Sequence, residues 1–389
     1  MQFSRRMANV RRSYIREILK VTQRPEVISF AGGLPSPDHF PVRGFAEATQ
    51  AVLDEAGPQA LQYSTTEGFP PLREFISRRY REKWGLDIPP EEILITSGSQ
   101  QGLDLIAKTL LDEGDTVLIE RPGYLGAIQC FSMFGVEFST VDLTPSGPDL
   151  EQLALRLEEG ARLFYVVPTF QNPSSTAWDL TTRQEAARLL AASNAVLLED
   201  NPYGELRFLG HDMPPVRAFF DDERAVLMGS FSKIVAPGLR LGWIAAKPAL
   251  MHHLVTAKQA SDLHTSTFTQ RVLARFLADT DLDEHIALIR KEYGERRDCM
   301  VEAIEKHFPV EVTASRPEGG MFLWCELPEG VSASALFEKT IACNVAFVPG
   351  RPFYVDGTDN AFRLNFSNST PERINEGIKR LGACLREAL

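Results

Sequence analysis

Residues 195–203 read AVLLEDNPY, and residues 225–233 read AVLMGSFSK. Each stretch begins with an apolar run and ends in acidic, phenolic, hydroxyl or amine side chains. An uninterrupted apolar run is typical of a strand that is buried on both faces of a parallel sheet. Similar runs, most of them separated by helical spacing, lie at 93–96, 117–119, 163–167 and 241–245. The sequence therefore predicts an α/β fold in which helices cover both faces of a mostly parallel sheet.

The chain has 389 residues, which is too long for one ordinary domain of roughly 100–200 residues. The alternation of strands and helices continues to about residue 285, where one long charged helix begins. Shorter apolar runs and a terminal helix follow it, so residues 286–389 are predicted to form a smaller α+β domain. We expect the large domain to span residues 45–285. Residues 1–44, which include an amphipathic helix around 14–19, are expected to pack with the small domain.

Composition excludes several classes of protein. The formal net charge of -11 argues against a general nucleic-acid binder. No run approaches about 20 apolar residues, so no membrane span is expected. The five cysteines are odd in number and contain no CxxC pair. We therefore expect neither a disulfide framework nor a metal site, and a reduced, cytoplasmic location is favoured.

Polar residues cluster after the predicted strands, where ligands bind in open α/β sheets. They are Ser97–Gln100, Tyr124, Thr169–Pro173, Asp200–Tyr203, Ser230–Lys233 and Arg240. A lysine of reduced pKa can form a Schiff base with an aldehyde, and a buried carboxylate can keep a pyridine nitrogen protonated. Hydroxyls, helix N-terminal amides and an arginine can hold a phosphate. This collection is what a site for pyridoxal 5'-phosphate (PLP) requires.

The same residues carry a family resemblance. The chain resembles the PLP-dependent aminotransferases of fold type I, class I/II, from about residue 28 to residue 366. The matching stretches are Ser97–Gln101, Asn172-Pro173, Glu199–Tyr203, Ser230–Lys233 and Leu239–Gly242. The resemblance implies the PLP-dependent transferase fold of type I. In that fold, a large domain with a mostly parallel seven-stranded sheet between helices is joined to a smaller α+β domain.

Other stretches are similar to the 2-aminoadipate/kynurenine aminotransferase branch. They are residues 29–35, 99–101, 260–265 and 318–322. That branch also contains bacterial and archaeal enzymes that act on aromatic and branched-chain amino acids. One departure is Ser174-Ser175, where many relatives carry Thr-Gly.

The resemblance implies a role for each matching residue toward the cofactor. Lys233 would form the Schiff base and then move the proton during catalysis. Asp200 would pair with the pyridinium nitrogen, while Tyr203 and Asn172 would hydrogen-bond the phenolic oxygen. Tyr124 would stack on the ring. The phosphate would be held by Ser99, Gln100, Ser230, Ser232 and Arg240. Tyr63 would reach the phosphate of the neighbouring subunit, which makes the active unit a homodimer with shared active sites.

The resemblance also implies a substrate site. Arg363, helped by Asn172, would clamp the α-carboxylate of the substrate as a bidentate pair, and Gly33 would offer its backbone to the same group. Arg24 precedes Pro25 just ahead of the glycine loop. In the aminoadipate branch a similarly placed arginine can meet a distal carboxylate, and a plain surface arginine is the alternative.

The predicted function is amino-group transfer from an L-amino acid to a 2-oxo acid by a ping-pong mechanism. The donor would be 2-aminoadipate or an aromatic, branched-chain or kynurenine-like amino acid, and the acceptor 2-oxoglutarate. The sequence does not select among these donors. It also leaves the assembly beyond a dimer open.

Several alternatives stay open. Glu199 competes with Asp200 by one register, because alternation cannot separate them in a buried strand, but the match to Asp-x-x-Tyr favours Asp200. His264 receives no role. The same cofactor could serve β-elimination or decarboxylation, since a fold does not fix a reaction. A regulator with an aminotransferase-like body would need a basic DNA-binding domain, and the negative charge and the early start of the body argue against it.

Overall fold

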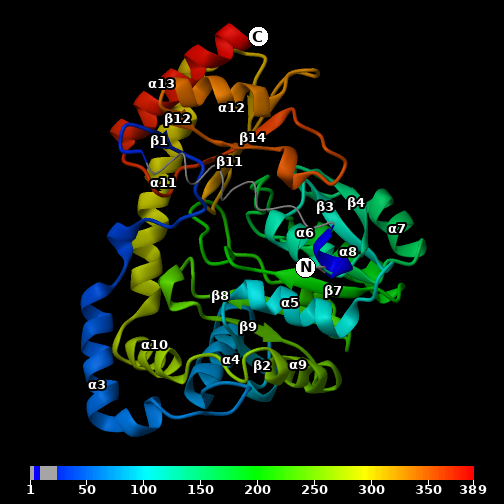
Figure 1. Cartoon of the computed structure of the whole chain (residues 1–389), viewed down its shortest axis with the longest axis vertical. Helices are drawn as coiled ribbons and strands as arrows, with labels where there is room; N and C mark the ends of the chain where they lie inside the picture. The colour runs from blue at the N-terminus through cyan, green and yellow to red at the C-terminus, as the bar shows by residue number, and fades with distance from the viewer. Residues whose placement is uncertain (1–3, 9–23) are drawn as a thin grey trace.

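The computed structural model describes residues 4–8 and 24–389. The helix expected around residues 14–19 lies outside the described residues. The sequence folds into a large sheet-centred part and a smaller part above it in Figure 1. The long helix α11 (Leu282–His307) runs alongside both parts, and the side chain of Asp281 caps its first turn. The expected domain borders after residues 44 and 285 fall inside α3 (Val42–Ala60) and α11.

The large sheet has the strand order β2-β9-β8-β7-β6-β3-β4-β5. Its strands are β2 (Ile93–Thr96), β3 (Thr116–Arg121), β4 (Glu137–Thr144), β5 (Gly147–Pro148), β6 (Leu163–Val166), β7 (Val196–Asp200), β8 (Ala225–Ser230) and β9 (Gly242–Ala245). The pairs among β3, β4, β6, β7 and β8 are parallel, and β9 runs antiparallel between β2 and β8.

This architecture confirms the predicted α/β fold with a mostly parallel sheet between helices. Seven strands match the expected number, and β5 adds a two-residue antiparallel extension to β4. The sequence pattern did not reveal β4, because most of its residues are partly exposed and the strand lacks a continuous apolar run.

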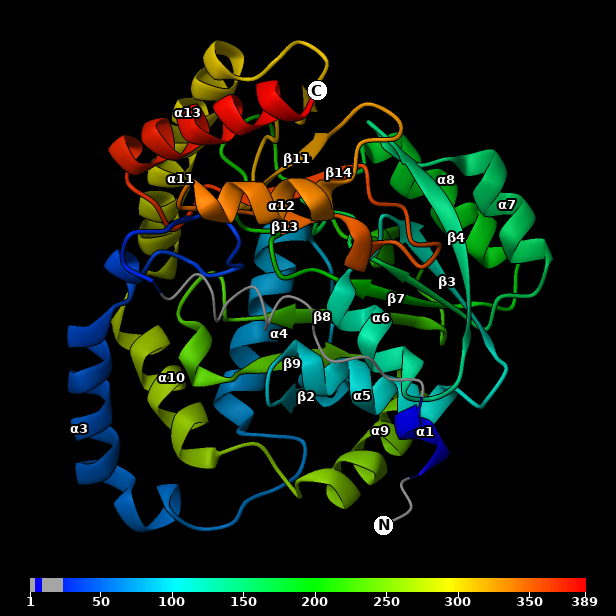
Figure 2. The ribbon, with the colours of Figure 1, turned by 45° about the horizontal axis from the view of Figure 1, so that its top comes forward.

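Alternate residues of the central strands enter two separate cores. Leu163 and Tyr165 of β6 belong to the core on one face, while Phe164 and Val166 belong to the core on the other. Helices α5 (Ser99–Leu110) and α6 (Leu125–Ser132) cover the first face, and α7 (Leu150–Glu158) and α8 (Leu180–Ala191) cover the second (Figures 1 and 2). A strand buried on both faces explains the uninterrupted apolar runs in the sequence.

Four further helices complete the large part. They are α3, α4 (Pro70–Trp84), α9 (Pro248–Ser261) and α10 (Thr267–Asp279). Helix α10 packs along α3, and α9 packs against α5 (Figure 2). The short helix α1 (Arg5–Ala8) lies near the N-terminus.

The smaller part contains an antiparallel sheet covered by helices. The sheet has the order β10-β11-β14-β13, formed by β10 (Thr313–Ala314), β11 (Phe322–Glu326), β13 (Val348–Pro349) and β14 (Ala361–Asn365). Helices α12 (Ala333–Ala342) and α13 (Pro371–Ala388) pack against each other, and α13 also packs on α11. Strand β1 (Ile28–Ser29) pairs in parallel with β12 (Val345–Ala346), so the chain just before the glycine loop is anchored here.

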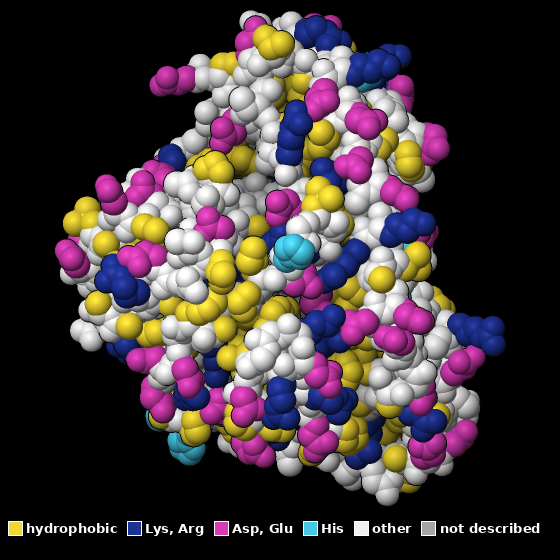
Figure 3. Space-filling view, turned by 180° about the vertical axis from the view of Figure 1, so that it is seen from behind, with side chains coloured by type: hydrophobic (Ala, Val, Ile, Leu, Met, Phe, Trp, Pro, Cys, Tyr) yellow, Lys and Arg dark blue, Asp and Glu magenta, His cyan; other side chains and the backbone are white. Residues whose placement is uncertain are grey.

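The surface mixes charged and apolar side chains. On the face opposite to the view of Figure 1, hydrophobic side chains gather across the middle, and acidic and basic side chains are interspersed around them (Figure 3). Among the helices of residues 4–8 and 24–389, none is both long enough and apolar enough to cross a membrane.

The contact between α13 and the β1 segment provides a test of this packing. A Cβ added at Gly377 would lie 2.6 Å from the ring of the fully buried Phe30 and 2.8 Å from Ile28 Cγ2. We expect Gly377→Ala to lower the free energy of unfolding by about 1–3 kcal/mol, because the core cannot move aside. Gly57→Ala is the matched control, since nothing lies within 4 Å of its added Cβ. Thermal unfolding should show a lower midpoint for Gly377→Ala alone, and equal midpoints would contradict this packing.

Candidate active site

The candidate site lies along the carboxyl ends of the parallel strands, which meet at one edge of the sheet. The residues that follow β2, β3, β6, β7 and β8 supply Ser99, Tyr124, Asn172, Tyr203 and Lys233. Strand β14 of the smaller sheet adds Arg363, whose guanidinium contacts Asn172. The smaller part of the chain therefore contributes a residue to the site.

Asp200 is the last residue of β7 and is buried. Its Oδ2 accepts a hydrogen bond of 3.0 Å from the hydroxyl of Tyr165, while its Oδ1 is buried without a partner among the described residues. Burial raises the pKa of Asp200 to about 7, although the hydrogen bond from Tyr165 acts in the opposite direction. A buried carboxylate oxygen without a partner is suited to a cationic ligand.

The neighbouring carboxylate has a different environment. Glu199 is also buried, but its two oxygens accept backbone hydrogen bonds of 3.0 Å from Val216 and Arg217. Successive strand residues point to opposite faces, so Glu199 faces away from Tyr165 and Asp200. The two carboxylates therefore differ in environment, and of the two only Asp200 has a buried oxygen without a partner among the described residues.

Lys233 lies in the turn after β8 and is half-buried. Its Nζ donates a hydrogen bond of 2.8 Å to the backbone carbonyl of Gly33. Burial, together with the positive charges of Arg363 and Arg240, lowers the pKa of Lys233 to about 8. A lysine with this pKa is partly neutral near pH 8 and can act as a nucleophile or a base.

Arg363 is a buried cation that pairs with no carboxylate in the described part of the chain. It donates 2.6 Å and 2.9 Å hydrogen bonds to Asn172 Oδ1 and to the carbonyl of Ala31. Its guanidinium lies 4.2 Å from the ring centroid of Phe322, and its Nε has no partner. Burial lowers its pKa to about 10. Such a group favours an anionic ligand, and a carboxylate fits its planar fork.

The predicted phosphate residues surround the start of α5. Ser99 and Gln100 open this helix, and the Gly98 before them has a φ of +82°. Arg240 donates to the carbonyl of Ser97 at 3.4 Å, and a Cβ at Gly98 would lie only 2.3 Å from Arg240 Nη2. Ser230 accepts a hydrogen bond of 3.1 Å from the backbone of Ser232. Hydroxyls, a helix N-terminus and a guanidinium therefore form a cradle for an anion.

Two tyrosines face the same space. Tyr203 is buried, hydrogen-bonds Asn172 and packs edge-on against Phe322 with ring centroids 5.9 Å apart. Burial raises its pKa. Tyr124 precedes α6, and burial together with the charge of Asp200 raises its pKa to about 12. Both phenols therefore stay protonated at neutral pH and can donate hydrogen bonds.

Two predicted residues are not joined to this group within the single chain. Tyr63 is 78% exposed, and its ring lies edge-on to His264 with centroids 5.8 Å apart. Arg24 is exposed, and the contacts recorded among the described residues do not connect its side chain to the site. Gly33 does lie in the site, where its carbonyl faces Lys233.

The sequence reasoning missed some residues that shape the site. Tyr165 holds Asp200, Ala31 holds Arg363 through its carbonyl, and Phe322 lies under the guanidinium. Strand alternation offered one signal, since Tyr165 lies in an apolar strand next to β7. The contacts of Ala31 and Phe322 depend on how the two parts of the chain meet, and no local pattern encodes that.

The described residues fit PLP. The free Oδ1 of Asp200 could meet a pyridinium nitrogen, Lys233 supplies an amine, and the cradle at Gly98 could hold a phosphate. Among the residues described, no cluster of His, Cys, Asp and Glu could hold a metal ion.

Comparisons with known proteins agree with this geometry. The family model for aminotransferase class I and II matches residues 25–381. The 2-aminoadipate transaminase of Thermus thermophilus is 42% identical over 100% of this chain and 97% of its own length. Aromatic-amino-acid aminotransferase 1 of Thermococcus litoralis is 41% identical over 100% of this chain and 94% of its own length.

A solved structure shows the same likeness. The α-aminoadipate aminotransferase LysN from Thermus thermophilus, complexed with N-(5'-phosphopyridoxyl)-L-leucine, superimposes with a TM-score of 0.91. It is 40% identical, with 99% of this chain and 97% of that chain covered. The family match spans the β1 segment, the large sheet and most of the smaller part. The chain therefore belongs to the class I and II aminotransferase family.

Proposed function

We propose that this aminotransferase uses PLP to move the amino group of an L-amino acid to a 2-oxo acid, with 2-oxoglutarate as the acceptor. The observation that carries the proposal is the unpartnered, buried Oδ1 of Asp200 in the same site as Lys233 and Arg363. These three groups supply an acid for a ring nitrogen, an amine for an aldehyde and a cation for a carboxylate.

The protein residues would divide the work as follows. When bound, PLP supplies an aldehyde that combines with amines and a ring that withdraws electrons. Asp200 would hold a proton on the ring nitrogen, and Tyr203 and Asn172 would hydrogen-bond the phenolic oxygen. Tyr124 would cover the ring. Ser99, Gln100, Ser230, Ser232 and Arg240 would hold the phosphate.

Arg363 would fix the substrate by its α-carboxylate. Because its cation is buried and already oriented by Asn172 and Ala31, a bound carboxylate would be held in one position. Lys233 Nζ would then remove the proton from the substrate Cα and return it later, since its lowered pKa allows the neutral amine near pH 8. Positioning of this kind supplies a large part of the rate enhancement.

A single carboxylate site also favours ping-pong kinetics. An amino acid and a 2-oxo acid both carry an α-carboxylate, and Arg363 is the buried cation placed to receive it. The two substrates would therefore use the same site in turn. Gly33 would offer its backbone to the same carboxylate.

We propose a homodimer with shared active sites. Leu61 and Tyr63 are 75% and 78% exposed, and the exposed Leu263 lies beside His264, which contacts Tyr63. Such neighbouring apolar side chains favour burial against a second copy. Tyr63 would then reach the phosphate in the partner subunit. The five cysteines are all free, which supports a reducing, cytoplasmic setting.

The donor class is the finer part of the proposal. The relatives above act, by their names, on 2-aminoadipate and on aromatic amino acids. We propose that this enzyme accepts acidic as well as apolar donors, and that Arg24 meets the distal carboxylate of the acidic ones. The hydrogen bond from the backbone of Val27 to the carbonyl of Arg24 places this residue just before β1 and the glycine loop.

Substitutions at three positions test the chemical roles. Lys233→Ala should abolish turnover and the yellow colour of the PLP-loaded protein, because the amine is lost. Asp200→Asn should lower kcat/KM by more than about 100-fold, since a neutral amide cannot stabilise the ring cation. Glu199→Gln is the matched control, because it should lower stability by about 1–3 kcal/mol and leave most of the activity. Steady-state kinetics and thermal unfolding distinguish the two carboxylates, and equal activity losses would contradict the assignment.

The lowered pKa of Lys233 predicts a pH dependence. The neutral amine attacks an aldehyde, so the rate at which cofactor-free protein combines with PLP should rise with pH and reach half its maximum near pH 8. Arg363→Met should move this midpoint to higher pH, because one nearby positive charge is removed. Stopped-flow absorbance measures the rate, and Lys233→Ala should lack the phase. A midpoint near 10.5, the ordinary value for lysine, would contradict the prediction.

A scan of amino donors tests the substrate proposal. With 2-oxoglutarate as acceptor, 2-aminoadipate, leucine, phenylalanine and kynurenine should be compared, and glutamate should be assayed with 2-oxoadipate, because its exchange with 2-oxoglutarate gives no net reaction. Arg24→Ala should lower kcat/KM for the acidic donors by roughly 10- to 100-fold and leave the apolar donors unchanged. Arg43→Ala is the matched control, since Arg43 is an exposed arginine paired with Glu47. Equal effects on both donor classes would remove Arg24 from the site. Formation of pyruvate and ammonia from serine, whose Cβ hydroxyl can leave, would favour β-elimination.

A further inference from the structure

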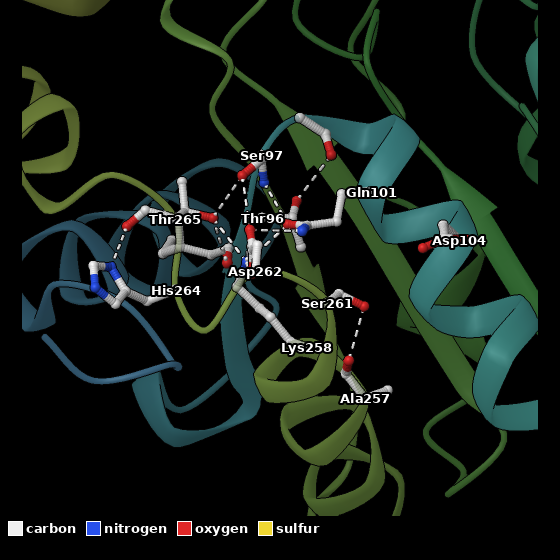
Figure 4. Close-up of polar contacts among 12 residues, drawn as sticks. Thr96, Ser97, Gln101, Asp104, Ala257, Lys258, Ser261, Asp262, His264 and Thr265 are labelled. Carbon is white, nitrogen blue, oxygen red and sulfur yellow. Dashed lines mark hydrogen bonds and ion pairs between the residues drawn. The ribbon is translucent and has the colours of Figure 1, made fainter. Parts of the chain in front are cut away.

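Lys258 is a lysine of α9 whose side chain is fully buried and has no role in the proposed chemistry. Its Nζ donates to Gln101 Oε1 at 2.8 Å, to Thr265 Oγ1 at 2.9 Å and to the Asp262 carboxylate at 2.9 and 3.0 Å. Figure 4 shows Lys258 reaching from its helix into these side chains. All three hydrogens of the ammonium therefore have acceptors, which lie at the start of α5 and in the loop at 262–265, so the side chain joins α9 to two other segments.

The same acceptors hold the loop that leads into α5. The backbone amide of Ser97 donates to Gln101 Oε1 at 2.8 Å, and the Ser97 hydroxyl donates to Asp262 Oδ2 at 3.2 Å. Gln101 Nε2 donates to the same Asp262 oxygen at 2.7 Å. The Gln101 amide thus has its oxygen shared by two donors and its nitrogen bound, so it has one orientation (Figure 4). We call Ser97, Gln101, Lys258, Asp262 and Thr265 the Lys258 cluster.

This cluster borders the anion cradle directly. Ser97 precedes Gly98 and Ser99, and its carbonyl accepts the hydrogen bond from Arg240. Gln101 lies in the first turn of α5, one residue after Gln100. Any movement of Ser97 or Gln101 would therefore move the helix N-terminus and the guanidinium that face the cradle.

The energetics of the buried Lys258 ion pair favour a role in positioning the segments that it joins over a role in stability. Moving a charge out of water offsets much of the attraction in a buried ion pair, so such a pair adds little stability over apolar packing. Satisfied buried polar groups instead fix the positions of the segments that they join. Here the segments are residues 97–101 at the start of α5, the end of α9 and the loop at 262–265.

We infer that the Lys258 cluster positions residues 97–101, at the start of α5, and thereby sets the affinity of the site for the phosphate of the cofactor. Lys258, Gln101 and Asp262 are positioning residues, because they act through Ser97 and the start of α5 and do not touch the cradle's ligand. The inference rests on the proposed function, in which that cradle holds the phosphate of PLP.

Pyridoxal provides the decisive comparison, because it carries the aldehyde and the ring of PLP but lacks the phosphate. Cofactor-free protein should be titrated with PLP and with pyridoxal, and the dissociation constants measured for the parent, Lys258→Met and Gln101→Met. We expect both variants to bind PLP about 10- to 100-fold more weakly, the range found when groups that orient binding ligands are removed. Their affinity for pyridoxal should stay at the parent value.

Lys108→Met is the matched control. Lys108 also lies on α5 and bonds Asp104 at 2.6 Å and Ser261 at 3.0 Å, so it joins α5 to α9 in the same way but away from the cradle. This variant should bind both ligands like the parent. If it weakened PLP binding as much as Lys258→Met does, general packing of α5 on α9 would explain the effect and the inference would be wrong.

The remaining outcomes each decide the matter. Equal weakening of PLP and pyridoxal, or parent-like PLP binding in both variants, would overturn the inference. If circular dichroism showed that Lys258→Met does not fold, Gln101→Met would decide alone, because Lys258 keeps Asp262 and Thr265 in that variant. A parent protein that bound neither PLP nor pyridoxal would refute the proposed function itself, which separates that failure from a failure of the cluster.

Discussion

The buried guanidinium of Arg363 is the constraint on which the site depends. A cation removed from water is unfavourable unless its donors find acceptors. Here the acceptors are Asn172 Oδ1, on the loop after β6, and the carbonyl of Ala31, on the chain after β1. One side chain of the smaller sheet thus holds two segments from elsewhere in the chain. Its Nε has no partner among the described residues, so a carboxylate that accepted from it would complete the arrangement.

Burial shifts the pKa values of Asp200 and Lys233 in opposite directions. It raises the pKa of Asp200 to about 7 and lowers the pKa of Lys233 to about 8, because it disfavours the charged form of each. A cation placed at the free oxygen of Asp200 would favour the carboxylate again. Lys233 needs no such added charge, because its lowered pKa already makes the neutral amine available. The same physical cause therefore prepares both an acid partner and a base in one site.

The Lys258 cluster borders the cradle but takes no part in the proposed chemistry. The loop at 262–265 touches Ser97 on one side and, through His264, Ser64 and the ring of Tyr63 on the other. A local arrangement of hydrogen bonds thus connects the cradle of one chain to the surface proposed to face the partner. The position of Tyr63, which is exposed in the single chain, follows from this contact.

The sequence alone determined the α/β class, most strands of the large sheet and the residues at their carboxyl ends, because apolar runs and turn residues are local signals; it missed the part-exposed β4. It also indicated Lys233, Asp200 and Arg363 through a family resemblance. Only the tertiary structure shows how the environments of Asp200 and Glu199 differ, since both lie in a strand buried on two faces and only their partners distinguish them. Tyr165, Ala31 and the Lys258 cluster came from the structure for the same reason: their contacts join segments that are far apart in the sequence, and no periodicity records such contacts.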